Sequence, residues 1–214
     1  MTAANELPPC GGLVLEGLVT TLNTDGAVNI APMGPRVDAS MERFVLRPYQ
    51  TATTYRNLKE HGEGVLHVTD DVWLVARAAL GPVEPAPDMF PAQSVRGSVL
   101  ADACRWHEFR VVRCDDRAER VTIDCVVVHT GRLRDFFGFN RAKHAVVEVA
   151  ILATRTEFLP IGQIRAEFEK LAVLVEKTGG DAEHRAFRFL LEHVNRVAAR
   201  AGHPPVDSSG PCRT

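Results

Sequence analysis

The first two thirds of the chain carry short apolar runs and period-two alternation, which are typical of β-strands. Val121, Ile123 and Cys125, for example, alternate with polar residues as in a half-buried strand. The dipeptide Asp25-Gly26 lies between two such runs and predicts a hairpin. We therefore predict strands over residues 13–22, 27–31, 44–47, 64–69, 105–114 and 120–130.

The hydrophobic period becomes helical at two short segments within this region and throughout the last third. One short helix presents Ala52, Tyr55 and Leu58 on one face, and a second begins after Asp70 or Asp71 as N-cap. Three longer amphipathic helices are expected: one from Asn140 to about Thr154, one from Pro160 to Gly179-Gly180, and one from Asp181 to Gly202 and Pro204. The predicted class is α+β with a mainly β core, short inserted helices and a three-helix C-terminal extension.

These elements predict four segments along the chain. Residues 1–12 are expected to be a mobile arm, 13–135 the β-rich domain, 136–202 the helical extension packed on it and 203–214 a disordered tail. Residues Pro82 to Asp102 contain four prolines and no periodicity, which predicts a long loop. Such a loop serves as a lid, an interface arm or a disordered segment.

Composition excludes several classes of protein. The 214 residues are 45% hydrophobic and 24% charged, with a formal charge of −2, so neither nucleic acid nor an anionic membrane is expected as a partner. We also predict no signal peptide and no membrane span. Five cysteines, an odd number without a CxxC pair, favour reduced thiols and a cytoplasmic location. They are Cys10, Cys104, Cys114, Cys125 and Cys212.

Familiar catalytic motifs are missing from the sequence. There is no GxGxxG after a strand, no GxxxxGK[ST], no GxSxG and no HExxH, and the eight histidines show no zinc-finger spacing. We therefore expect no metal site. The carboxylate pairs Asp70-Asp71 and Asp115-Asp116 are better explained as a helix cap and a turn than as acid/base groups.

A hydroxyl-rich turn between the third strand and the first helix is the strongest candidate for chemistry. The start of a helix offers unpaired N–H groups and the positive end of its dipole to an anion. Three threonines and two arginines add donors suited to a phosphate monoester. They are Thr51, Thr53, Thr54, Arg47 and Arg56. Alternatively, Thr51 or Thr53 simply caps the helix.

Two other strand ends complete a candidate groove. The run Asn29-Ile30-Ala31-Pro32-Met33 ends a strand at two prolines, which leaves backbone groups unpaired. The run His67-Val68-Thr69-Asp70 ends another. Together with the threonine turn, they form three walls of one predicted groove.

These motifs, together with Val19-Thr20-Thr21, the run RPYQTATTYRNL and the run GEGVLHVTDD, resemble an uncharacterised-function family of the FMN-binding split β-barrel proteins. That superfamily includes flavin reductases and pyridoxamine oxidases. The similarity covers roughly residues 13–200, and the run FFGFNRAKHA at 136–145 resembles the family's helical extension.

The resemblance implies a six-stranded split barrel that forms a homodimer with FMN at the subunit interface. By position, Thr51, Thr53, Thr54 and Asn57 would hold the phosphate, with Arg47 or Arg56 as charge partner. The remaining implied contacts are Asn29, Ala31, Pro32 and Met33 along the isoalloxazine, and His67, Thr69 and Asp70 beside the ring or ribityl chain.

Several of these residues have a structural alternative. Met33 suits a core position, His67 a satisfied strand histidine and Arg56 a solvated helix position. Asn140, Arg141 and Lys143 either close over the flavin from the partner subunit or form a surface helix cap.

The sequence therefore predicts a homodimeric FMN-binding flavoprotein. As an enzyme it would be an oxidoreductase passing hydride equivalents from a reduced nicotinamide or another reductant to a small acceptor, with no obligatory acid or base. The alternative is a non-catalytic flavin- or ligand-binding module for assembly or sensing. A deazaflavin or haem in place of FMN also stays open.

Overall fold

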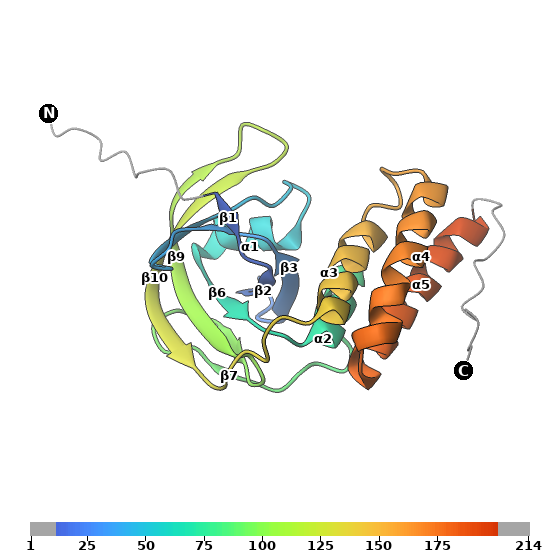
Figure 1. Ribbon diagram of the computed structural model, residues 1–214. Helices are drawn as coiled ribbons and strands as arrows, with labels where there is room; N and C mark the ends of the chain where they lie inside the picture. The colour runs from blue at the N-terminus through green and yellow to red at the C-terminus, as the bar shows by residue number, and fades with distance from the viewer. Residues whose placement is uncertain (1–11, 201–214) are drawn as a thin grey trace, which may run out of the picture. The chain divides into compact units, whose positions relative to one another are not determined.

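The computed structural model describes residues 12–200 (Figure 1). The chain forms two compact units, one from residues 12–68 and 87–135, the other from residues 69–86 and 136–200. The predicted arm of residues 1–12, apart from Gly12, lies outside the described residues, as do the tail predicted over 203–214, Cys10 and Cys212. Among the described residues, Cys104, Cys114 and Cys125 form no disulfide.

The first unit is built on a curled antiparallel sheet of eight strands, in the order β1-β4-β5-β10-β9-β6-β2-β3. The predicted strand over 13–22 is divided, because its first part pairs with β4 and its second with β3 and β6. Six strands have four residues or more, and β1 and β4 add two residues each. Their bounds are β1 Leu13–Val14, β2 Gly17–Leu22, β3 Val28–Met33, β4 Arg36–Val37, β5 Arg43–Leu46, β6 Glu63–Val68, β9 Arg105–Asp115 and β10 Thr122–Arg132.

The inner face of this sheet curves around helix α1, Thr53–His61 (Figure 1). Alternate strand residues such as Val19, Leu66 and Phe109 pack there against Tyr55 and Leu58 of the helix. Their burial supplies the main hydrophobic stabilisation of this unit. Gly62 ends α1 in the left-handed conformation, with φ of 67°.

The outer face is covered by a small hairpin that the sequence did not reveal. Strands β7, Met89–Pro91, and β8, Ser98–Leu100, lie within the predicted structureless loop, so that prediction is wrong for these residues. The hairpin buries Val95 and Val99 against Val65 and Trp106 of the sheet. These sheet residues alternate with those facing α1, so the hairpin and α1 lie on opposite faces.

Four helices form the second unit: α2 Val72–Leu80, α3 Arg141–Ala153, α4 Ile161–Thr178 and α5 Asp181–Arg200. The three predicted C-terminal helices are confirmed. Asp71 caps α2 by accepting from the Leu74 N–H at 3.0 Å, and Asn140 caps α3 through the Lys143 N–H, also at 3.0 Å. Val72 and Ala76 of α2 join the core formed by α3, α4 and α5. No helix within residues 12–200 is long and apolar enough to cross a membrane.

Candidate functional site

The start of α1 has no side-chain cap. Its N-cap residue is Ala52, in an extended conformation with φ of −71° and ψ of 138°, and no side chain accepts from the first turn. The alternative that Thr51 or Thr53 caps this helix is therefore wrong. The N–H groups of Thr53, Thr54 and Tyr55 have no acceptor within the helix and remain available for an anion.

A positive charge lies directly over this helix start. The Arg56 guanidinium donates to Thr53 Oγ1 at 2.9 Å and to the Thr51 carbonyl at 3.3 Å. Both Thr51 and Arg56 are exposed. Backbone N–H groups, threonine hydroxyls and a guanidinium form a donor set that fits a phosphate group.

The other polar residues of the predicted cradle face inward. Thr54 is 2% exposed and Asn57 is 6% exposed. The Asn57 amide donates to Thr21 Oγ1 at 3.0 Å and to Asn23 Oδ1 at 2.8 Å. Both amide hydrogens of Asn57 are thus used inside the protein, and its side chain cannot donate a hydrogen bond to a phosphate.

Asn29 joins the threonine turn to strand β3. Its amide donates to Thr21 Oγ1 and to Thr54 Oγ1, each at 3.2 Å. The structure thus brings together two of the three predicted groove walls. Thr21 and Asn23 take part in these contacts but were not predicted as site residues, because neither carries a local signal of its partners.

Strand β3 is an edge of the sheet, and all six of its residues are half-buried. The β2–β3 register puts Asn29, Ala31 and Met33 on the inner face beside α1, whereas Pro32 faces the other side. Met33 also packs against the core, as the structural alternative predicted. Pro32 can therefore offer only its backbone carbonyl, at the open edge of the strand.

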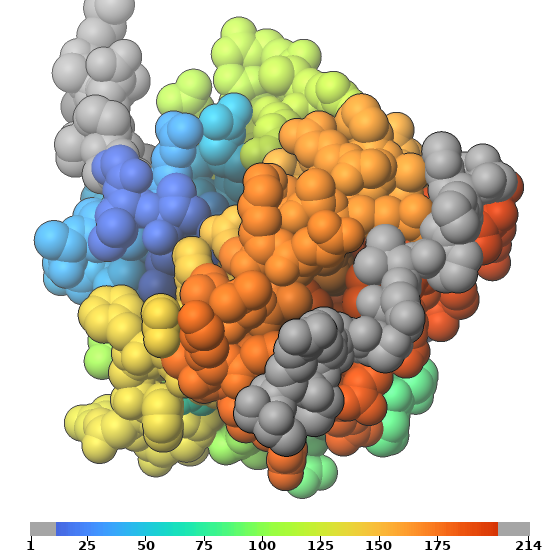
Figure 2. All heavy atoms as spheres, turned by 45° about the vertical axis from the view of Figure 1, so that its right-hand side comes forward, coloured from blue at the N-terminus to red at the C-terminus, as the bar shows by residue number. Residues whose placement is uncertain are grey.

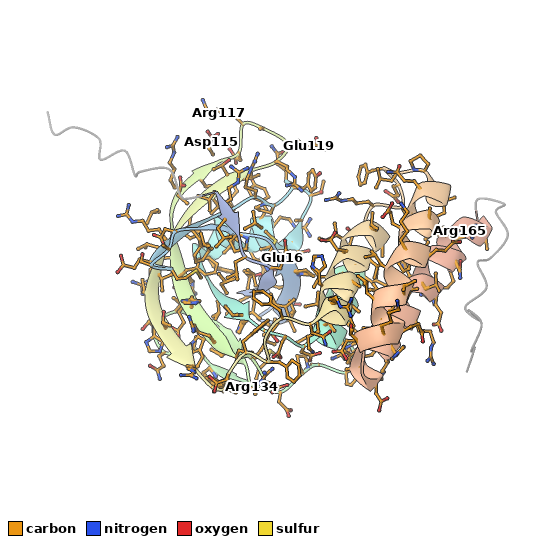
Figure 3. All side chains as sticks on the ribbon, in the orientation of Figure 1. Glu16, Asp115, Arg117, Glu119, Arg134 and Arg165 are labelled. Atoms are coloured by element: carbon orange, nitrogen blue, oxygen red, sulfur yellow. The ribbon has the colours of Figure 1, made fainter. Side chains whose placement is uncertain are left out.

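The β9–β10 hairpin anchors α1 from its other side. Tyr55 and Lys59 both donate to the Asp116 carboxylate, at 2.8 and 2.9 Å. These hydrogen bonds lower the pKa of Asp116, Lys59 being the larger cause, and raise that of Lys59. The tip of the hairpin stands out from the surface (yellow-green in Figure 2), with Asp115 and Arg117 paired there (Figure 3). Asp116 is thus an anchor of α1 as well as part of a turn.

Arg47 directly follows Leu46, the last residue of β5, which points into the core. Its Nε is buried and has no hydrogen-bond partner among residues 12–200. Arg47 as a phosphate partner stays a prediction, whereas Arg56 is the arginine that contacts the threonine turn in the structure.

His67 is a structural histidine rather than a flavin contact. It is 0% exposed, its Nδ1 lies 3.2 Å from the Leu18 carbonyl, and its Nε2 accepts from the Leu100 N–H at 3.1 Å. Burial lowers its pKa to about 4, so the ring is neutral. No ring nitrogen is left for a ligand, which corrects that prediction.

The remaining predicted residues belong to the second unit, where most have structural partners. The Asp70 carboxylate accepts from the Phe137 N–H, and Lys143 donates to the Asp70 carbonyl and to Glu183. Thr69 accepts from the Asp71 N–H, and Asn140 caps α3 while donating to the Thr178 carbonyl. The helix-cap alternative is therefore supported for Asn140. Of this group, only Arg141 has an exposed side chain.

Two further observations concern other kinds of site. A shallow groove at the opposite end of α1 is lined by Asn23, Thr24, His61, Glu63 and Arg96, and it contains none of the predicted site residues. Over residues 12–200, no three His, Cys, Asp or Glu side chains are placed to hold a metal ion.

Comparison with solved structures defines the class of fold. The structure of an FMN-bound protein from Methanosarcina mazei matches with a TM-score of 0.74 and 22% identity, over 86% of this chain and 96% of that one. A 2-nitrobenzoate 2-nitroreductase from Pseudomonas fluorescens matches with a TM-score of 0.48 and 19% identity, over 57% of this chain and 66% of that one. The styrene monooxygenase flavin reductase from Pseudomonas putida S12 matches with a TM-score of 0.48 and 12% identity, over 56% of this chain and 79% of that one. The fold is the α+β split β-barrel of the FMN-binding type, which confirms the predicted class.

The family follows from the sequence itself. Residues 15–134 match the N-terminal domain of the family described as "Protein of unknown function (DUF447)", and residues 140–192 match the model described by the same words. The chain belongs to this family. The resemblance found from the sequence motifs is thereby confirmed.

Proposed function

We propose that this protein binds FMN, with the phosphate at the start of α1. The observation that carries the proposal is the uncapped first turn, whose free N–H groups lie under the Arg56 guanidinium. Thr51 and Thr53 complete the donor set, and Thr54 contributes its backbone N–H. The FMN-bound state of the Methanosarcina mazei protein, which has the same fold, supports FMN as the ligand.

The flat ring would lie along the inner face of β3. Ala31 and Met33 offer an apolar surface there, and Asn29 offers a polar group at the same level. Such a combination of an apolar wall and a few fixed polar groups suits a planar heterocycle. Of the residues predicted to close over the flavin from the partner subunit, Arg141 stays in the proposal, whereas Asn140 and Lys143, like Asp70, are assigned to structural roles.

The proposed activity is that of a homodimeric oxidoreductase in the cytoplasm acting on a small molecule. Bound flavin would supply the hydride chemistry, while the chain binds the flavin, orients it and limits its contact with water. The alternative is a flavin-binding module without turnover. Anaerobic mixing with NADH or NADPH distinguishes the two, because only the oxidoreductase would bleach the bound flavin at a useful rate.

The phosphate site is tested by comparing FMN with riboflavin, which lacks the phosphate. Arg56→Gln should weaken FMN binding about tenfold, as expected for loss of a hydrogen bond to a charged group. Riboflavin affinity should change less than about twofold. Arg188→Gln, an exposed arginine on α5, is the matched control and should leave both affinities unchanged. Equal loss for the two ligands would put the phosphate elsewhere, and absence of flavin binding by the wild type would refute the proposal.

A further inference from the structure

A buried polar network connects β2, β3 and α1 behind the proposed flavin site. It runs from Asn23 through Asn57 and Thr21 to Asn29 and Thr54, with donor–acceptor distances between 2.8 and 3.2 Å. Thr21 is its centre, because its hydroxyl oxygen accepts from both asparagine amides. At 1% exposure, Thr21 has no access to a ligand itself.

The network determines which polar group of Asn29 is presented outward. Both amide hydrogens of Asn29 are directed inward, to Thr21 and Thr54. Its carbonyl oxygen has no partner among the described residues, and the residue is half-buried on the edge strand. An amide held in this way can only accept a hydrogen bond from a ligand.

We infer that Thr21 is a positioning residue of the flavin site, which together with Asn57 orients the Asn29 carbonyl toward a hydrogen-bond donor on the ligand. The inference rests on the proposed function. A flavin offers two donors of this kind, the imide N–H of the ring and the hydroxyl groups of the ribityl chain. Because both occur in FMN and riboflavin, the contribution of Thr21 is independent of the phosphate.

The same network also fixes the distance between the two halves of the site. Thr54 belongs to the first turn of α1, which would hold the phosphate, and Asn29 belongs to the strand beside the ring. A site whose supporting residues are hydrogen-bonded in this way is held close to its productive geometry. Loss of the Thr21 hydroxyl would release both asparagine amides at once.

The experiment compares Thr21→Val with Thr21→Ser. Thr21→Val keeps the shape of the side chain but removes the hydroxyl, and it should raise the Kd of both FMN and riboflavin about tenfold. Thr21→Ser keeps the hydroxyl and should bind both within about twofold of the wild type. Arg56→Gln, which should affect FMN alone, is the reference for a phosphate effect. All titrations are made well below the Tm of each variant.

Two further measurements separate positioning from a general loss of stability. The visible circular dichroism of flavin at saturation should change in Thr21→Val and be restored in Thr21→Ser, since it reports the surroundings of the ring. With 3-methylriboflavin, which lacks the imide N–H, weak wild-type binding identifies the imide as the donor. Binding equal to that of riboflavin identifies a ribityl hydroxyl.

The inference is overturned if Thr21→Val binds both flavins as tightly as the wild type, or if Thr21→Ser binds them as weakly as Thr21→Val. Should Thr21→Val not fold, Asn23→Ala removes the half-buried outer acceptor of the network. This substitution should raise the Kd of both flavins about threefold, and unchanged affinities would again overturn the inference. A wild-type protein that binds no flavin would instead refute the proposed function.

Discussion

Lys143, Glu183 and Asp70 show how charged side chains can organise a helical unit without touching a ligand. Lys143 donates to Glu183 at 2.8 Å and to the Asp70 carbonyl at 2.8 Å, and Glu183 also accepts from the Gly180 N–H. Burial raises the pKa of Glu183, but the hydrogen bonds from Lys143 and Gly180 outweigh it, so the net pKa is lowered. The cluster joins the segment before α2 to the first turns of α3 and α5.

Replacing Lys143 therefore tests a structural role against a flavin-binding one. Lys143→Ala leaves the buried Glu183 carboxylate with the Gly180 N–H alone and should lower the free energy of unfolding by about 2–3 kcal/mol. Denaturant titration measures this loss. FMN affinity of the folded variant should be unchanged, and a selective loss of FMN binding with normal stability would contradict the structural assignment. Arg141→Ala, the exposed neighbour, is the control for stability.

Glu108 performs a similar task on the outer face of the barrel. Its carboxylate is 0% exposed and accepts from the N–H groups of Gln93, Ser94 and Val95 and from Trp106 Nε1. Burial raises its pKa, but these donors more than compensate, and the net pKa is lowered. The turn between β7 and β8 is thereby fastened to strand β9.

The lowered pKa predicts how this contact depends on pH. A carboxyl group with a lower pKa in the folded state stabilises the protein above its unfolded pKa, about 4.3, and loses this contribution as the pH falls through its folded pKa. Glu108→Gln should lower the free energy of unfolding by about 1–3 kcal/mol at pH 7. The difference between variant and wild type should shrink as the pH is lowered below about 4. A pH-independent difference would contradict a role for the charge.

At the scale of elements, the sequence predicts what depends on local pattern. The longer strands, helix α1 and the three C-terminal helices follow from periodicity, caps and glycine stops. Strands β7 and β8 do not, because three-residue strands depend on Glu108 and Trp106, which lie outside the segment. The same limit applies to the site. The threonine turn and Asn29 are recognisable locally, whereas the role of Thr21 depends on the pairing of β2 with β3, and the inward direction of Asn57 depends on the packing of α1 against β2.

Helix α1 provides a prediction in which stability and binding change in opposite directions. Ala52 has the extended conformation of an N-cap but no side-chain acceptor. Ala52→Asp should cap the helix and raise the free energy of unfolding by about 1 kcal/mol. Its carboxylate would occupy the free N–H groups and repel a phosphate, so FMN should bind at least about tenfold more weakly.

Ala52→Ser separates the two effects, because serine caps without a charge. It should give a similar gain in stability with a smaller loss of FMN affinity, and riboflavin binding should change little in either variant. Thermal denaturation and FMN titration on the same samples measure both quantities. FMN binding that is unaffected by Ala52→Asp would show that the phosphate does not use the start of α1.

At the scale of the whole molecule, the fold class and the family could be predicted from the sequence because several motifs coincide at expected positions. None of the three sequence motifs that form the walls of the predicted groove identifies the family when taken alone. The structure supports the first two walls, β3 and the threonine turn. It does not support the third, because both ring nitrogens of His67 interact with backbone groups of Leu18 and Leu100. Burial of a strand histidine depends on what covers that face of the sheet, which here is the β7–β8 hairpin.

FMN should raise the free energy of unfolding of the protein, because a ligand that binds only the folded state stabilises it by mass action. At a free FMN concentration of about 100 times Kd, the expected gain is about 2.7 kcal/mol. For a chain of this length, such a gain corresponds to a rise in Tm of roughly 5–10 °C. Riboflavin at the same concentration should give a smaller rise, and Arg56→Gln should move the FMN response part of the way toward the riboflavin level. Equal shifts for FMN and riboflavin in the wild type would mean that the phosphate contributes nothing, and the uncapped start of α1 would then need another ligand.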